Sequence, residues 1–165
     1  MFEVTKIKKK AEIFFSDGTT MTGNFFVAPH APTHAGTESV ADLLSNDRLY
    51  IPFETIDGHV VLVQKNCIVK ILLAESNIDK NLPYLEDAQA QVVFLSGETL
   101  EGKVYLDLPK SNSRLSDFLN YSRQFFYLEV GTRDYLVNSG LVQYVQPGMN
   151  RHTSLHSRTI GSLQD

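Results

Sequence analysis

The sequence predicts an all-β fold made of two tandem copies of one small module, with one short helix in each copy. A strand-turn-strand pattern with two glycines five residues apart occurs twice, and each occurrence is followed by a helical pattern and three more strands. We therefore expect two tandem five-stranded small barrels. The boundaries are residues 1–74 for the first copy, 75–87 for a linker, 88–147 for the second copy and 148–165 for a flexible C-terminal tail.

The first hairpin is the clearest part of the repeat, because the two segments align at one constant offset without a gap. Gly18 and Gly97 lie in the turns, where glycine adopts a positive φ without steric cost. Gly23 and Gly102 fall inside the second strand, where a glycine commonly marks a bulge or a bend. A bend at that position is what closure of a small barrel requires.

A short helical pattern follows each hairpin, over residues 37–44 and 113–120. In both patterns, apolar residues with i, i+3, i+4 spacing fall on one face. Thr37 is the expected N-cap of the first helix. Asp42 and Asp117 occupy the same place in the two helices. We expect each to form a structural hydrogen bond with nearby loop backbone, and not to act as half of a catalytic pair.

Three further strands are expected in each copy. They span residues 49–54, 59–63 and 67–73 in the first copy, and 124–129, 134–137 and 141–145 in the second. The Asp57-Gly58 turn is the strongest hairpin signal in the chain. Pro52 cannot donate a ladder hydrogen bond, so its strand is expected to be an edge strand or to be bulged there.

Composition indicates an ordinary globular protein. Hydrophobic residues make up 42% of the chain, the formal net charge is -4 and the pI is about 5.7, a balance that disfavours nucleic acid as the main partner. The single cysteine, Cys67, excludes an intramolecular disulfide, and its apolar neighbours predict a small core residue. No run approaches the ~20 apolar residues that cross a bilayer. We expect a cytoplasmic, bacterial protein with no signal peptide and no membrane span.

Two pairs of histidines have the four-residue spacing that can bind a metal on a helix. His30 and His34 lie in a loop that is rich in Ala and Pro, and His152 and His156 lie in the polar tail. Neither pair has an acidic or cysteine ligand at suitable spacing, so no metal site is expected. The sequence also contains no phosphate-binding glycine loop and no nucleophile motif. We expect no catalytic residues and no cofactor, and thus a protein that is not an enzyme.

Aromatic and arginine residues gather in the second copy, and they form the candidate binding set. The set comprises Arg114, Tyr121, Arg123, Phe125 and Tyr127. Aromatic rings interleaved with arginine can stack nucleic-acid bases on the face of a barrel. The alternative is that these side chains fill the core and form an interface with the first copy.

The glycine pairs also support a family resemblance. Gly18 with Gly23, and Gly97 with Gly102, have the spacing of a glycine after strand one and another in the bent strand two. In this respect each copy resembles the Sm-like small barrels, and the SH3-like barrels more broadly. The helix after the second strand is similar to small duplicated bacterial domains of unknown function. In the Sm-like family the polar residues that hold an RNA base lie partly in the turn before the last strand. This chain has Lys65-Asn66 there in one copy and Ser139-Gly140 in the other, so RNA binding is not carried over from the resemblance.

The leading hypothesis is a non-enzymatic protein-interaction or adaptor module built from a duplicated small β-barrel. It is motivated by the duplication and by the lack of a polar constellation suited to catalysis. The expected partner is a protein, which includes a second copy of the chain as a homo-oligomer. The alternative hypothesis is an Sm-like RNA- or nucleotide-binding protein, which the acidic pI disfavours.

Overall fold

The computed structural model describes residues 5–32, 35–75, 86–106, 114–121 and 124–148. The first copy contains β1 (Ile7–Phe15), β2 (Thr20–Val27), α1 (Val40–Leu44), β3 (Tyr50–Thr55), β4 (Val60–Gln64), a 3-10 turn η1 (Lys65–Cys67) and β5 (Ile68–Leu73). The second contains β6 (Glu86–Phe94), β7 (Thr99–Leu106), α2 (Leu115–Tyr121), β8 (Phe125–Val130), β9 (Arg133–Asn138), η3 (Ser139–Leu141) and β10 (Val142–Pro147). The β-rich class and the repeated order of elements are as predicted.

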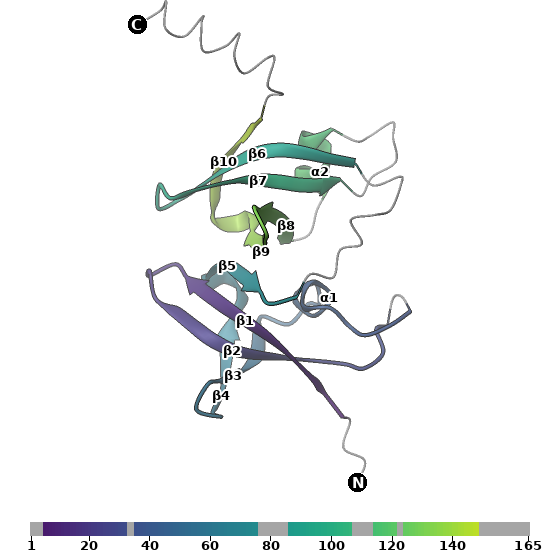
Figure 1. The fold of residues 1–165 in the computed structure, drawn as a ribbon. Coiled ribbons are helices and arrows are strands. Elements are labelled where there is room, and N and C mark those ends of the chain that lie inside the picture. The colour runs from purple at the N-terminus through teal and green to yellow at the C-terminus, as the bar shows by residue number, and fades with distance from the viewer. Residues whose placement is uncertain (1–4, 33–34, 76–85, 107–113, 122–123, 149–165) are drawn as a thin grey trace, which may run out of the picture.

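The ten strands form a single antiparallel sheet in the order β10-β6-β7-β8-β9-β5-β1-β2-β3-β4. Within each repeat the strands therefore lie in the same order, with the fifth strand beside the first and the fourth at the far end. Figure 1 shows the two repeats one above the other, with β5 and β9 between them. The repeats thus join through the fifth strand of the first and the fourth strand of the second.

Glycine is required at the two positions of the predicted motif for two different structural reasons. Gly18 and Gly97 have φ values of 89° and 88°, which confirms the predicted turns. Inside β2 and β7, a Cβ atom on Gly23 would lie 1.9 Å from the carbonyl oxygen of Glu54, and one on Gly102 would lie 2.2 Å from that of Glu129. The interior glycines are therefore needed because the third strand of each repeat passes directly against them.

Helix α1 begins later than predicted, because its N-cap is Ser39 and not Thr37. The Ser39 hydroxyl accepts a hydrogen bond from the backbone N–H of Asp42 at 3.0 Å, and the Asp42 carboxylate accepts one from the Ser39 N–H at 2.9 Å. This reciprocal capping box fixes the start of the helix. It also confirms the predicted structural role of Asp42.

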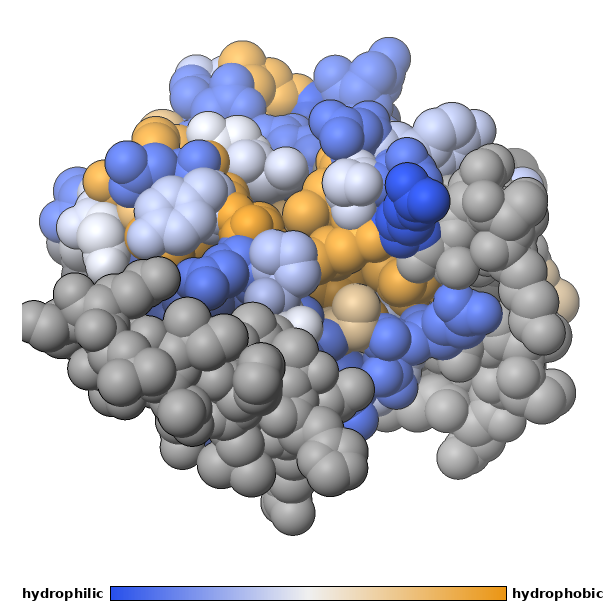
Figure 2. Space-filling model, turned by 90° about the horizontal axis from the view of Figure 1, so that it is seen from above, coloured by the Kyte–Doolittle hydropathy of each residue, from blue (hydrophilic) through white to orange (hydrophobic). Residues whose placement is uncertain are grey.

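Each repeat builds its own hydrophobic core from equivalent positions. Phe15 and Leu44 pack in the first core, and their equivalents Phe94 and Leu119 pack in the second. The helices enclose the cores to different extents: Val40 and Leu44 of α1 are buried, whereas α2 has no buried residue. Hydrophobic atoms are visible at the surface on the second-repeat side of the molecule (Figure 2). The like surroundings of equivalent residues support the duplication.

Two expectations were wrong in detail. The strand that contains Pro52 is not an edge strand, because β3 lies between β2 and β4. Nor is β3 bulged there, since its pairing with β2 and β4 has no register shift. The structure accommodates the proline because the pairing of β3 with β2 runs from Thr55 to Phe53 and does not reach Pro52. Cys67 was expected in the core but is exposed. It lies in the 3-10 turn between β4 and β5, which turns its side chain out of the apolar run.

Candidate functional site

The junction between the repeats is a continuous antiparallel pairing of β5 with β9. Ile71 faces Leu136 and Leu72 faces Tyr135 in this register. The backbone N–H of Ala74 bonds to β1, so the alternate residues of β5, Ile71 among them, direct their backbone groups toward β9. The repeats are therefore joined by main-chain hydrogen bonds and not by side-chain packing alone.

Side chains from each repeat also enter the core of the other. Phe125 and Leu136 of the second repeat belong to the first core. In return Phe14, Val69 and Leu72 of the first repeat pack against the second core. Strands β5, β8 and β9 thus supply apolar side chains on both of their faces, as strands covered on both sides do.

A buried polar contact fixes the end of this junction. Asn138 is 1% exposed, and its side-chain amide donates to the carbonyl oxygens of Lys65 at 3.3 Å and Ile68 at 2.8 Å. Its carboxamide oxygen accepts from the N–H of Gly140 at 2.9 Å. Because a buried amide left without hydrogen bonds would cost free energy, these contacts favour one register of β9 on β5.

The only charged side chain of β5 is also buried at the junction. The Lys70 ammonium pairs with Glu98 in the turn between β6 and β7. It lies 4.8 Å from the ring centroid of Phe14, 5.6 Å from that of Phe94 and 6.0 Å from that of Tyr135. Its charge is therefore compensated by one carboxylate from the other repeat and by aromatic ring faces.

Strand β4 occupies in the first repeat the place that β9 occupies in the second, but among the described residues no strand lies on its outer side. The N–H of Thr55 bonds to the carbonyl of His59, so the backbone groups of Val60 and Leu62 point outward, away from β3. An edge with outward N–H and C=O groups is a template for pairing with another strand.

The side chains on this edge are apolar and exposed. Leu62 is 66% exposed and Tyr50 is 50% exposed, whereas their equivalents Leu136 and Phe125 are 0% and 8% exposed at the junction. The same positions are therefore buried where the edge is paired and open where it is not. We call the exposed set, which comprises Tyr50, Val60 and Leu62, the β4 edge.

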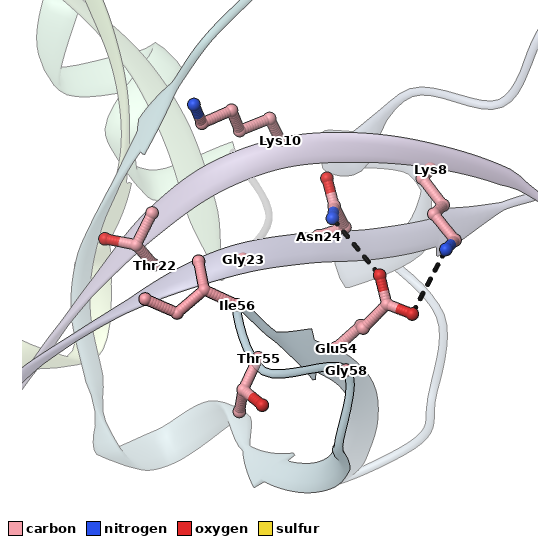
Figure 3. A pocket seen from close by; sticks show the side chains of 9 residues that line it. All are labelled: Lys8, Lys10, Thr22, Gly23, Asn24, Glu54, Thr55, Ile56 and Gly58. Carbon is pink, nitrogen blue, oxygen red and sulfur yellow. Dashed lines mark hydrogen bonds and ion pairs between the residues drawn. The ribbon is translucent and has the colours of Figure 1, made fainter.

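A shallow pocket lies between β1, β2, the end of β3 and the β3–β4 turn (Figure 3). The Glu54 carboxylate accepts hydrogen bonds from Lys8 at 3.1 Å and from Asn24 at 3.3 Å across its wall. A second cation, Lys10, and the exposed Ile56 also line it. The charges of Lys8 and Glu54 are thus already paired within the protein, and the residues that line the pocket include no nucleophile held by a base.

A second buried cation supports the loop behind the edge. The Lys65 ammonium donates to the carbonyl oxygens of Leu44 at 3.2 Å and Asn46 at 2.6 Å, and to the side-chain oxygen of Asn46 at 3.3 Å. Burial lowers the pKa of Lys65, and the nearby Asp47 opposes that shift. Lys65 thus holds the end of α1 against the start of η1.

The predicted binding set is not gathered on one face. Tyr121 is 82% exposed and Arg114 is exposed, but Phe125 lies in the first core and Tyr127 packs against it. Arg123 lies outside the described residues, as do His34 and residues 149–165 of the predicted tail, which include His152 and His156. Phe125 and Tyr127 therefore lie in the interface between the copies, which was the structural alternative.

The sequence contained a signal for the β4 edge. Residues 60–63 are Val-Val-Leu-Val, an uninterrupted apolar run typical of a strand covered on both faces. In β4 only one face is covered, since Val63 is 4% exposed and Leu62 is 66% exposed. The mismatch between a two-faced pattern and one-faced burial marks this strand as incompletely covered.

Searches for similar proteins identified no relative. No protein-family model, no curated protein and no solved structure matches the chain. Within the described segments, no group of three or more His, Cys, Asp or Glu side chains is arranged to bind a metal ion. None of the helices in those segments is long and apolar enough to span a bilayer.

Proposed function

We propose that the chain is a non-enzymatic protein-interaction module that binds another polypeptide by adding a strand to its β4 edge. The observation that carries the proposal is the contrast between Leu136, which is buried where β9 pairs with β5, and its equivalent Leu62, which is exposed. Strand addition supplies main-chain hydrogen bonds along the edge, and the side chains of alternate residues supply specificity.

We also infer that each repeat is a small barrel of the Sm-like or SH3-like kind. Two observations support this. Each repeat has the same strand order, with the fifth strand beside the first. In each, the third strand approaches the backbone of the interior glycine, Gly23 or Gly102, so closely that no side chain fits. Such a barrel would hold the β4 edge in a fixed, extended conformation and lower the entropic cost of binding.

The test is affinity capture from native lysate with the wild-type chain and a variant that carries Val60→Lys and Leu62→Lys. Burying a leucine side chain stabilises a complex by about 1.5–3 kcal/mol. Since ~1.4 kcal/mol corresponds to a tenfold change in affinity, we expect edge-dependent proteins to be recovered at least about tenfold less by the variant. Quantitative mass spectrometry of the bound fraction provides the measurement.

Ile56→Lys is the matched control. Ile56 is 83% exposed in the β3–β4 turn and lies outside the strands, so this variant places one of the two added lysine charges close by without changing the edge. We expect this control to capture the same proteins as the wild type. Equal capture by the edge variant, or no specific capture by a wild-type chain that is also monomeric, would contradict the proposal.

A further inference from the structure

We propose that the polypeptide bound at the β4 edge is strand β10 of a second copy of this chain, so that copies associate head to tail. This inference rests on the proposed function, since it names the partner of the same site. Its basis is that the single sheet formed by the described strands ends in β4 on one side and in β10 on the other. These two strands are the repeat equivalents of β9 and β5, which already pair inside the chain.

The internal junction supplies the register for the contact between copies. Where Ile71 faces Leu136 at the junction, the equivalent residues are Val145 in β10 and Leu62 in β4. The backbone groups of Val145 point away from β6, as those of Ile71 point away from β1. The reason is that the N–H of Gly148 bonds to β6 as the N–H of Ala74 bonds to β1. The backbone groups of Val145 and Leu62 therefore point outward from the two ends of the sheet.

The apolar side chains of the proposed contact would also pack in positions equivalent to those at the junction. At the junction Leu136 enters the first core beside Ile71. In the proposed contact Leu62 enters the second core beside Val145, which already packs against that core. Helix α2 beside that core has no buried residue, whereas α1 has two. Apolar surface left exposed at one end of the molecule is thus covered by apolar surface at the other.

The buried ion pair at the junction, between Lys70 and Glu98, has no counterpart in the proposed contact. Both residues of the pair are replaced by uncharged residues at the equivalent positions. The position equivalent to Lys70 is Tyr144, which is 54% exposed, and the position equivalent to Glu98 is Thr19. Pairing β10 with β4 would therefore bury an aromatic ring beside a threonine and the partly buried Phe15. No unpaired ammonium or carboxylate would be left in the interface.

The proposed contact is weaker than the junction, which makes the association reversible. The residue equivalent to Leu73 is Pro147, which has no N–H to donate at an outward-pointing position. In addition, Gln143 and Gln146 stand where the junction has Val69 and Leu72, so less apolar surface is buried. The assembly is therefore expected to depend on protein concentration.

The geometry of the contact is heterologous, because two different edges meet. Each added copy again leaves one β4 edge and one β10 edge open. Association of this kind continues until the copies close into a ring, or it forms a filament. An isologous contact of β4 with β4 would instead stop at two copies.

The experiment compares the full chain with two variants, each altered at one edge. Leu62→Arg blocks β4 and Tyr144→Arg blocks β10, and both replaced side chains are more than half exposed in the chain itself. We measure mass by light scattering after size exclusion over a range of concentrations. The wild type, and the control Ile56→Arg, are expected to form species that are multiples of the 18.6 kDa chain, whereas each variant alone is expected to be monomeric.

Mixing the two variants provides the decisive measurement. Leu62→Arg keeps an intact β10 and Tyr144→Arg keeps an intact β4, so the mixture is expected to form a one-to-one heterodimer and nothing larger. Recovery of a complex by mixing also shows that both variants are folded. A monomeric wild type, no heterodimer in the mixture, or dimerisation of Tyr144→Arg alone would each overturn the head-to-tail proposal.

The outcome separates this inference from the proposed function. If the wild-type chain is monomeric but captures another protein only when the β4 edge is intact, the proposed function stands and self-association is wrong. If the edge variants change neither the mass of the purified chain nor the set of captured proteins, both are wrong.

Discussion

Lys65 shows how a single charged residue can be structural and yet invisible to sequence patterns. In the sequence it is a lysine in a polar turn, but in the structure it is 4% exposed and donates to three oxygen atoms from Leu44 and Asn46. Its position near the last carbonyls of α1 is also where a cation is stabilised by the helix dipole. Nothing local to the turn indicates these contacts, because their acceptors lie about twenty residues earlier in the chain.

Replacing Lys65 with methionine is expected to destabilise the protein. The methionine keeps the apolar stem but removes the donor to the carbonyl oxygens of Leu44, which is buried, and of Asn46. The side-chain oxygen of Asn46 still accepts a hydrogen bond from the N–H of Arg48. Leaving buried acceptors unsatisfied costs about 1–3 kcal/mol. Denaturant titration at pH 7 measures the loss, and an unchanged free energy of unfolding would show that the lysine contacts contribute nothing.

The same residue makes a prediction about pH. Burial lowers the pKa of Lys65 below its ordinary value of 10.5 in the folded state. Between the lowered pKa and 10.5 the unfolded chain binds the proton more tightly than the folded chain, so the free energy of unfolding rises with pH in that window. We expect the free energy of unfolding of the wild type, measured relative to Lys65→Met, to increase as the pH approaches 10.5. A constant difference would contradict the lowered pKa.

At the scale of elements, the strands and turns were largely predictable because their signals are local. Asp57-Gly58 and the turn glycines Gly18 and Gly97 identify turns by the positive φ that glycine permits. The helix boundary was less predictable, since Thr37 and Ser39 both suit an N-cap. The choice of Ser39 depends on Asp42 lying three residues after it, which completes the capping box.

The interior glycines were predicted as bends, but their requirement is a close approach between strands. Gly102→Ala would place a methyl group 2.2 Å from the carbonyl oxygen of Glu129, so β7 and β8 must move apart. Overpacking of this kind costs typically about 1–3 kcal/mol. We expect a lower thermal midpoint for Gly102→Ala and a small change for its exposed neighbour in the control Glu101→Ala, both measured by calorimetry. Similar midpoints for the two variants would contradict the close approach.

At the scale of the whole molecule, the duplication was predictable and the joining of the copies was not. Aligning the halves identifies equivalent positions such as Leu44 and Leu119 without any knowledge of which strands meet. The β5–β9 pairing depends on backbone groups, which every strand carries. The residue types in the two strands therefore do not indicate which strand each one pairs with. The sequence does show that Leu136 and its neighbours form an apolar run, but not that the first core is where Leu136 lies.

The candidate binding set illustrates the same limit. Phe125 and Tyr127 lie close to Tyr121 in the sequence and suggested a shared face. In the structure β8 directs the first two toward the other repeat, whereas Tyr121 at the end of α2 is exposed. Proximity along the chain therefore did not predict a common surface. The β4 edge became recognisable only when Leu62 could be compared with its buried equivalent.

The central claim is that β5 and β9 make the two repeats one continuous sheet, and amide hydrogen exchange of the native chain tests it most directly. The backbone N–H groups of Ile71 and Leu136 point at one another's strands in the observed register. We expect both to exchange only through global unfolding, as slowly as the amides of Ile13 and Val92 in the two cores. Fast exchange at Ile71 and Leu136, with slow exchange kept in the cores, would contradict the claim.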